Sequence, residues 1–433
     1  MFNQYQRLKL SRNPFPAEPY ARDDGDLFVD EVVSEELQTF RKRLIAGPLA
    51  EGRSMSFLWS LGAFGADTGY GKTATLKRMA KEINSDWGAT TLRSAGASDT
   101  EVHQNPICAM YVMFNAKETN GLYAGLFEAI RWAAATPTKK KGQTLLWALR
   151  EKALAKAGAK GPDAAGRLPG ILEQAHGRFG HGLSELRADF VQLLVSAEDA
   201  GALADGLTNV SPTTRQRSGH SYFQAFLCLA AAAGMVRVFT FLDQIEDLAN
   251  PSLTTKRKRF QEVERLRDTL IEDPVIGKLG SFVLTLHRRA EDALIDAWVN
   301  SRLPSFEPEL KTNMSRILIM RGLRDDTSAE TLAAAFLATA RTPDTPPDRL
   351  WPFTADAVAT MRVRNSGRIS KFLEDCYSVL AYAAEADASP PLDSAYVEEV
   401  TAPEVADETA AAAYATDAAL RGEKAADEVL GKV

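Results

Sequence analysis

The chain has 433 residues, 45% of them apolar and 25% charged, with a formal net charge of −6. These fractions are typical of a soluble globular protein of two or three domains, and they exclude a wholly disordered chain, collagen or a coiled-coil rod. The charge is uneven, because residues 385–433 hold 12 acidic and three basic side chains, a net −9, which leaves +3 for the rest. The acidic total argues against a histone-like DNA coat, whereas the slightly basic body can still carry a local basic face.

The cysteines and the chain start indicate a cytoplasmic protein. Three scattered cysteines, at positions 108, 228 and 376, form neither a disulfide framework nor a zinc-ligand pattern. The first ten residues, MFNQYQRLKL, lack an apolar signal core, and the longest apolar run, 225–236, is too short to span a bilayer. We therefore expect no membrane segment.

The predicted elements begin with an extended, proline-containing arm over residues 1–26. Apolar residues at 33, 37, 40 and 44 share one helical face, which predicts a helix over 34–44. Short apolar runs predict strands at 56–61, 106–114, 236–242 and 280–286. Helical patterns lie between them at 72–83, 122–135, 221–234 and 255–271.

Strands that alternate with helices predict an α/β fold with a parallel sheet covered by helices. Residues 136–215 are rich in lysine, glycine and alanine and are expected to form a helical insertion. The chain from residue 315 onward reads as helical, and the last 45 or so residues read as a mobile acidic tail.

The strongest motif is ADTGYGKT at residues 66–73, which matches the Walker A pattern G-x-x-x-x-G-K-[ST] with alanine in the first position. Its glycines allow backbone N–H groups to curve around phosphate oxygens, and the following helix directs its dipole at the anion. Lys72 is expected to reach the β- and γ-phosphates of ATP, and the Thr73 hydroxyl to ligate Mg²⁺. The predicted nucleotide-contacting residues of this motif are Ala66, Asp67, Thr68, Gly69, Tyr70, Gly71, Lys72, Thr73 and Ala74.

A second acidic residue fits the metal. The segment VRVFTFLDQIEDL, residues 236–248, reads as a strand that ends in Asp243. Such a strand carries its carboxylate to the carboxyl edge of a parallel sheet, where α/β proteins bind ligands. Asp243 is therefore predicted to hold Mg²⁺, directly or through water, while a plain strand-end acid in a turn is the alternative.

With both Walker elements present, the chain resembles the AAA+ ATPases, and within them the group of origin-recognition initiators, transposition regulators and ExeA-like secretion ATPases. The resemblance covers roughly residues 10–384 outside the insertion. It implies a base domain at 27–310, a helical lid at 311–384 and an acidic, alanine-rich tail at 385–433. The strings NPFP and LFVDEVVSEEL resemble the arm and first helix that close over adenine, which makes Phe28 an adenine contact.

The same resemblance assigns residues near the γ-phosphate. The strand before His287 resembles the sensor 1 strand, where His287 or Thr285 would contact the γ-phosphate or the attacking water, with His287 favoured. The string DAWVNSRLPSF resembles the end of a base domain and makes Arg302 the candidate arginine finger, with Arg288 and Arg289 as rivals. Arg368 lies at the sensor 2 position of a lid-like segment, and a solvated surface charge is the alternative for each arginine.

One departure concerns hydrolysis. Many AAA+ proteins place a glutamate after the Walker B aspartate to orient water, whereas this chain has Gln244, which cannot accept a proton. The string DQIED resembles the DQFEE of STAND-type signalling ATPases. Either Glu246 takes over the role, or hydrolysis is slow and ATP acts mainly as a switch. Glu246 could also simply cap the following helix.

Partner signals are weaker. Four basic residues open the helix predicted after Asp243, and a ring of such helices could follow a DNA backbone. They are Lys256, Arg257, Lys258 and Arg259. Nearby acids dilute this charge, so a solvated helix is the alternative.

Two function hypotheses follow, beside the alternative of an inactive P-loop scaffold. The first is an oligomeric ATPase, a ring or filament, that drives loading or remodelling on double-stranded DNA with a partner protein. The second is a slow ATP-dependent regulatory switch in a bacterial complex, for example in antiviral defence.

Overall fold

The computed structural model describes residues 4–18, 27–52, 54–60, 69–114, 121–161, 163–179, 187–245, 256–286, 288–303 and 316–402. The chain divides into two compact units. Residues 33–320 form the first, which we call the sheet unit. Residues up to 32 and from 321 onward together form the second, which we call the helical unit.

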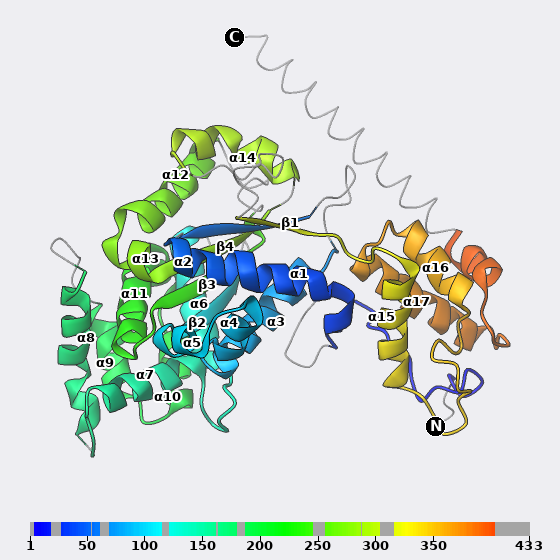
Figure 1. The fold of residues 1–433 in the computed structure, drawn as a ribbon, viewed down its shortest axis with the longest axis horizontal. Coiled ribbons are helices and arrows are strands. Elements are labelled where there is room, and N and C mark those ends of the chain that lie inside the picture. The colour runs from blue at the N-terminus through cyan, green and yellow to red at the C-terminus, as the bar shows by residue number, and fades with distance from the viewer. Residues whose placement is uncertain are drawn as a thin grey trace, which may run out of the picture. The chain divides into compact units, whose positions relative to one another are not determined.

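A five-stranded parallel sheet is the centre of the sheet unit (Figure 1). Its strands, in spatial order, are β2 (Ile107–Met113), β3 (Arg237–Asp243), β4 (Gly280–Leu286), β1 (Met55–Ser60) and β5 (Ile317–Met320). The predicted α/β class with a parallel sheet is confirmed, and four strands lie where the short apolar runs predicted them.

The fifth strand corrects the sequence interpretation, which took the chain from residue 315 onward as helical. β5 pairs with β1, with Phe57 opposite Ile317. A four-residue apolar run such as ILIM has no measurable period, so periodicity alone does not separate a buried strand from a helix.

Helices cover both faces of the sheet, so the strands are apolar along their length. Val238 and Leu242 of β3 belong to the main core cluster. Phe241 points to the other face, where its ring meets Phe40 edge-on at 5.7 Å. The helices of this unit outside the 136–215 segment are α1 (Ser34–Thr39), the π-helix η2 (Phe40–Ala46), α2 (Gly47–Glu51), α3 (Lys72–Ser85), α4 (Ala89–Ala95), α5 (Asp99–Gln104), α6 (Leu122–Ala135), α11 (Pro212–Ala232), α12 (Lys256–Arg267), the π-helix η6 (Asp268–Glu272), α13 (Pro274–Leu279) and α14 (Arg288–Asn300).

The described residues of segment 136–215 are mainly helical, as predicted. They include α7 (Leu145–Lys156), the 3-10 turn η3 (Ala164–Arg167), α8 (Leu168–Gly177), α9 (Ala188–Ser196) and α10 (Ala200–Thr208). Buried leucines and Phe190 of these helices belong to the same core cluster as the sheet. The segment is therefore an integral part of the sheet unit.

A side chain forms hydrogen bonds with the backbone of the edge strand β2. The amide of Asn84, at the end of α3, donates to the carbonyl oxygen of Ala109 at 2.8 Å and accepts from the N–H of Ala109 at 2.8 Å. This pairing satisfies backbone groups that an edge strand would otherwise offer to another chain.

The helical unit contains α15 (Asp326–Ala338), α16 (Ala355–Arg364) and α17 (Ile369–Glu385), and the short 3-10 turn η1 (Asp30–Val33) lies at its boundary. Residues 4–18 pack into its core, where Leu8, Leu10 and Phe15 are buried. The Trp351 indole donates to the carbonyl oxygen of Leu8 at 3.1 Å. The N-terminal segment is thus part of a folded core over these residues rather than an extended arm.

The first residues of the expected mobile tail are folded, and residues 403–433 lie outside the described part of the chain. Residues 394–402 are helical, and Leu392 and Val397 are buried in the core of the helical unit. Leu392, Tyr396, Val397 and Val400 recur at a helical spacing, but the pattern is too short to stand out in an Ala- and Glu-rich stretch. No helix among the described residues is long and apolar enough to cross a membrane.

Candidate functional site

The second half of the glycine-rich motif forms a tight turn into α3. Gly69 and Gly71 both have a φ of 87°, a left-handed conformation that favours glycine, and Tyr70 between them is buried. α3 begins at Lys72, and within the described chain no side chain caps its amino end. Uncapped N–H groups at the start of a 14-residue helix suit a phosphate. Ala66, Asp67 and Thr68 lie outside the described residues.

Lys72 and Thr73 both point toward the carboxyl edge of the sheet. The Lys72 ammonium is buried and donates to the carbonyl oxygen of Leu286, the last residue of β4, at 3.2 Å. The Thr73 hydroxyl donates to Oδ2 of Asp243 at 2.6 Å. The structure therefore brings together the two residues that the sequence assigns to Mg²⁺.

The Asp243 carboxylate is 1% exposed and accepts hydrogen bonds on both oxygens. Oδ2 accepts from Thr73 and from the Tyr111 hydroxyl at 2.9 Å. Oδ1 accepts from the Thr285 hydroxyl at 3.0 Å and from the N–H of Gln244 at 3.1 Å. Donors from α3, β2 and β4, together with the N–H of the next residue, thus fix the acid at the end of β3.

Tyr111 is the member of this cluster that the sequence analysis missed. It lies on β2 among buried apolar residues. A tyrosine in an apolar run is typical of an ordinary core position, so the sequence did not indicate a role at the site. Burial raises the pKa of the Tyr111 phenol well above the ordinary value, and the adjacent Asp243 carboxylate raises it further. The ammonium of Lys77 lies over the Tyr111 ring, 5.5 Å from its centre.

Gln244, the residue after Asp243, has an unusual backbone conformation. Its φ is 58°, in the left-handed region that residues other than glycine seldom occupy. Its N–H donates to the Thr285 hydroxyl at 2.7 Å as well as to Asp243. The chain thus turns sharply beside the acid. Glu246 and His287 lie outside the described residues, whereas Thr285, the other sensor 1 candidate, contacts Asp243 directly.

Arg302 is exposed directly after α14 and also has a left-handed φ, of 56°. Its neighbours Ser301 and Leu303 are buried, so the turn holds the arginine outward. Arg368 and Phe28 belong to the helical unit, where Arg368 directly precedes α17 without a capping hydrogen bond from its side chain, and Phe28 is half-buried. Their roles stay predictions, as does that of Ala74 in the first turn of α3.

The basic helix after Asp243 is α12, which begins at Lys256. Arg257 is exposed. Arg265 pairs with the buried carboxylate of Glu262 at 2.6 Å. Arg267 forms ion pairs with Asp268 and Glu272. The side chains of Lys256, Lys258 and Arg259 lie outside the described part.

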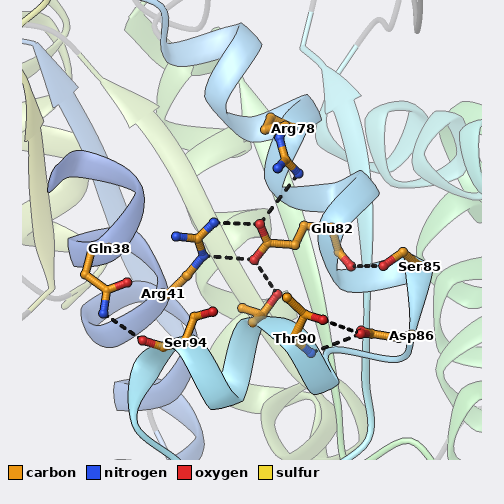
Figure 2. A network of polar contacts seen from close by, with 9 residues as sticks. Gln38, Arg41, Arg78, Glu82, Ser85, Asp86, Thr90 and Ser94 are labelled. Carbon is orange, nitrogen blue, oxygen red and sulfur yellow. Dashed lines mark hydrogen bonds and ion pairs between the residues drawn. The ribbon is translucent and has the colours of Figure 1, made fainter. Parts of the chain in front are cut away.

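A second polar cluster fixes α3 from behind (Figure 2). Glu82 of α3 accepts two hydrogen bonds from Arg41 of η2, at 2.9 and 2.7 Å, and one from Thr91 of α4 at 2.9 Å. Arg78 approaches the same carboxylate to 3.5 Å. Burial opposes ionisation of Glu82, but these donors and charges outweigh it and hold its pKa below the ordinary value. The helix that presents Lys72 and Thr73 is thereby anchored to two neighbours.

The donor set suits Mg²⁺ and a nucleotide. A threonine hydroxyl and a carboxylate are hard oxygen ligands of the kind that Mg²⁺ prefers. Among the described residues, no three His, Cys, Asp or Glu side chains cluster closely enough to hold a metal. Thr73 and Asp243 would therefore supply part of a shell that phosphates and waters complete, as is usual for Mg²⁺ with nucleotides. Comparison with known proteins finds neither a matching family model nor a curated protein of significant similarity.

Proposed function

We propose that this chain is a P-loop ATPase of the AAA+ type that binds Mg-ATP at the amino end of α3 and hydrolyses it slowly. The observation that carries the proposal is the hydrogen bond between Thr73 and Asp243. The sequence assigns each residue to Mg²⁺ on separate grounds, one from a glycine-rich motif and one from a strand that ends in an acid. Their contact across the fold is what a shared metal site requires.

The chain's own residues would divide the work. Thr73 and Asp243 would hold Mg²⁺, which when bound neutralises phosphate charge as a Lewis acid. Lys72 would exchange the carbonyl oxygen of Leu286 for phosphate oxygens, and the N–H groups of α3 would bind the same anion. Gln244 could orient a water molecule but could not take its proton, which supports slow turnover.

Assembly with other subunits is the second part of the proposal. Arg302 is exposed, and its left-handed backbone holds it away from the buried residues on either side. An outward, forked cation is suited to a phosphate bound by a neighbouring copy. We therefore propose ATP-promoted oligomers in which Arg302 completes the adjacent site.

The structure bears on the choice between a DNA-coupled ATPase and a regulatory switch. Two of the arginines of α12, Arg265 and Arg267, are paired with acids. This pairing lowers the positive charge that α12 can offer to a DNA backbone, and it favours the switch. DNA loading or remodelling stays the competing proposal.

One assay separates the two: steady-state ATP hydrolysis with and without double-stranded DNA at low salt, with Lys72→Ala as the blank. Slow turnover that DNA does not change, and that Lys72→Ala abolishes, supports the switch. Strong stimulation by DNA that Arg257→Ala weakens supports the DNA-coupled ATPase. Turnover equal to that of the blank, together with no ATP binding, rejects the P-loop ATPase itself.

A further inference from the structure

The hydroxyl of Tyr111 has no part in the proposed nucleotide chemistry, yet it lies against the Asp243 carboxylate. Tyr111 and Asp243 stand on neighbouring strands, and β2 pairs with β3 so that Tyr111 is opposite Phe241. The phenol is 4% exposed and donates to Oδ2 at 2.9 Å. It is fixed by β2, a strand that carries no part of either Walker element.

The Asp243 carboxylate has no spare acceptor position in this arrangement. A carboxylate offers about four lone-pair positions, two on each oxygen. Thr73 and Tyr111 take those of Oδ2, and Thr285 and the Gln244 N–H take those of Oδ1. A cation, or a water bound to it, reaches Asp243 only where one donor gives way.

The four donors differ in what their displacement would cost. Thr73 is itself a proposed ligand. Its hydroxyl oxygen can bind a cation while its O–H still donates to Asp243. The Gln244 N–H donates to the Thr285 hydroxyl at 2.7 Å, and both groups also donate to Oδ1. Displacing either of them would therefore disturb the other. The Tyr111 hydroxyl is the donor that shares Oδ2 with Thr73 and is not itself a proposed ligand.

We propose that Tyr111 is a positioning residue whose phenol competes with the divalent cation for Oδ2 of Asp243, and so sets the Mg²⁺ concentration at which the site fills. The inference rests on the proposed function, since it concerns the same Mg-nucleotide site. Removal of the hydroxyl frees one acceptor position beside Thr73. Mg²⁺ then binds the nucleotide complex more tightly.

The test uses the full chain and the substitution Tyr111→Phe, which removes one oxygen atom. The measured quantity is the midpoint of a Mg²⁺ titration that follows binding of a fluorescent ATP analogue. We expect the midpoint to fall about tenfold, equivalent to about 1.4 kcal/mol. Tyr222→Phe is the control, because Tyr222 of α11 is also buried and donates to an aspartate, Asp189 of α9, at 2.7 Å.

The outcomes are distinct. A purely structural role predicts that both variants unfold at lower temperature and that neither midpoint moves. A midpoint in Tyr111→Phe that is unchanged, or that rises, overturns the inference while leaving nucleotide binding in place. A wild-type chain that binds no nucleotide at any Mg²⁺ concentration overturns the proposed function itself, and this inference with it.

Discussion

Thr73 and Asp243 lie 170 residues apart in the chain, and the hydroxyl of the first donates to the carboxylate of the second at 2.6 Å. Parallel strands explain the contact. α3 begins soon after β1, and Asp243 ends β3, so both reach the same carboxyl edge of the sheet. β4 lies between β1 and β3 and contributes Thr285 to the same cluster.

The Thr73 hydroxyl is the first target for mutation. Thr73→Val keeps the shape of the side chain but removes the ligand, so Mg²⁺-dependent ATP binding should weaken about 100-fold, the upper end for residues that support a metal. Thr73→Ser retains the hydroxyl and should restore binding. The measurement is the Mg²⁺ dependence of ATP binding by calorimetry. Equal Mg²⁺ dependence in Thr73→Val and the wild type would remove Thr73 from the metal site.

The Glu82 cluster predicts a pH-dependent contribution to stability. Glu82→Gln leaves Arg41 partly buried without its carboxylate and should lower the free energy of unfolding by about 3 kcal/mol at neutral pH. The pKa of Glu82 is held below its ordinary value of 4.5, so its ionised form stabilises the fold above pH 4.5. This stabilisation is lost as the pH falls below 4.5 through the lowered pKa.

Denaturant unfolding at several pH values tests this prediction. The difference in the free energy of unfolding between wild type and Glu82→Gln should be largest above pH 5 and should become smaller below pH 4.5. Asp99→Asn is the control, because the Arg93–Asp99 pair has a similar nitrogen–oxygen distance of 2.9 Å but is exposed. An exposed pair contributes little to stability, because water and salt screen its charges. If the free energies of unfolding of wild type and Glu82→Gln differed by the same amount at every pH, the account of Glu82 would be contradicted.

The sequence predicted the architecture well where apolar runs were bounded by turn residues. Four strands and α3 followed from such runs, and Asp243 followed from its place at the end of one. β5 was missed because ILIM is too short to show a period. The packing of Leu392 and Val397 was missed because their helical spacing with Tyr396 and Val400 is short and lies in an Ala- and Glu-rich stretch.

The site was predictable only in part. A motif reports residues that are close in sequence, so Lys72 and Thr73 could be assigned, whereas Tyr111 reaches Asp243 through strand pairing that the sequence does not state. The DNA contact predicted for the four basic residues that open α12 stays a prediction, whereas an ion pair further along this helix followed from the sequence. Glu262 lies three residues before Arg265, which is a spacing that pairs side chains on a helix, and the structure forms that pair.

Arg237, at the start of β3, predicts a stabilising substitution. It is 8% exposed, burial lowers the pKa of its guanidinium, and no acidic side chain of the described residues pairs with it. Its guanidinium donates a long hydrogen bond, of 3.3 Å, to the carbonyl oxygen of Gly280. Arg237→Met should therefore raise the free energy of unfolding by about 1 kcal/mol, since a poorly paired buried charge opposes folding.

Arg150 provides the matched control. It is equally buried, but it donates to the carbonyl oxygen of Leu194 at 2.7 Å and stacks on Trp147. Arg150→Met should lower the stability by about 2 kcal/mol, because it leaves a buried acceptor unpaired. Thermal unfolding of both variants decides the matter. If Arg237→Met lowered the stability as much as Arg150→Met, Arg237 would be shown to be well paired.

The N-terminal segment predicts a long-range effect on the helical unit. Phe15 is 3% exposed and stacks on Phe336 with ring centres 5.5 Å apart. Phe15→Ala should destabilise the helical unit by about 3 kcal/mol. Leu27→Ala, at a position that is 42% exposed, should have an effect within about 0.5 kcal/mol. Scanning calorimetry that finds the two variants equally stable would contradict the packing of residues 4–18.

The central claim is that the amino end of α3 binds Mg-ATP, and titration calorimetry of three chains tests it most directly. They are the wild type, Lys72→Ala and Lys81→Ala, in which Lys81 is an exposed lysine on the same helix. We predict one binding site in the wild type, binding at least tenfold weaker in Lys72→Ala, and no change in Lys81→Ala. Equal affinities in all three chains, or no binding by the wild type at millimolar ATP, would contradict the account.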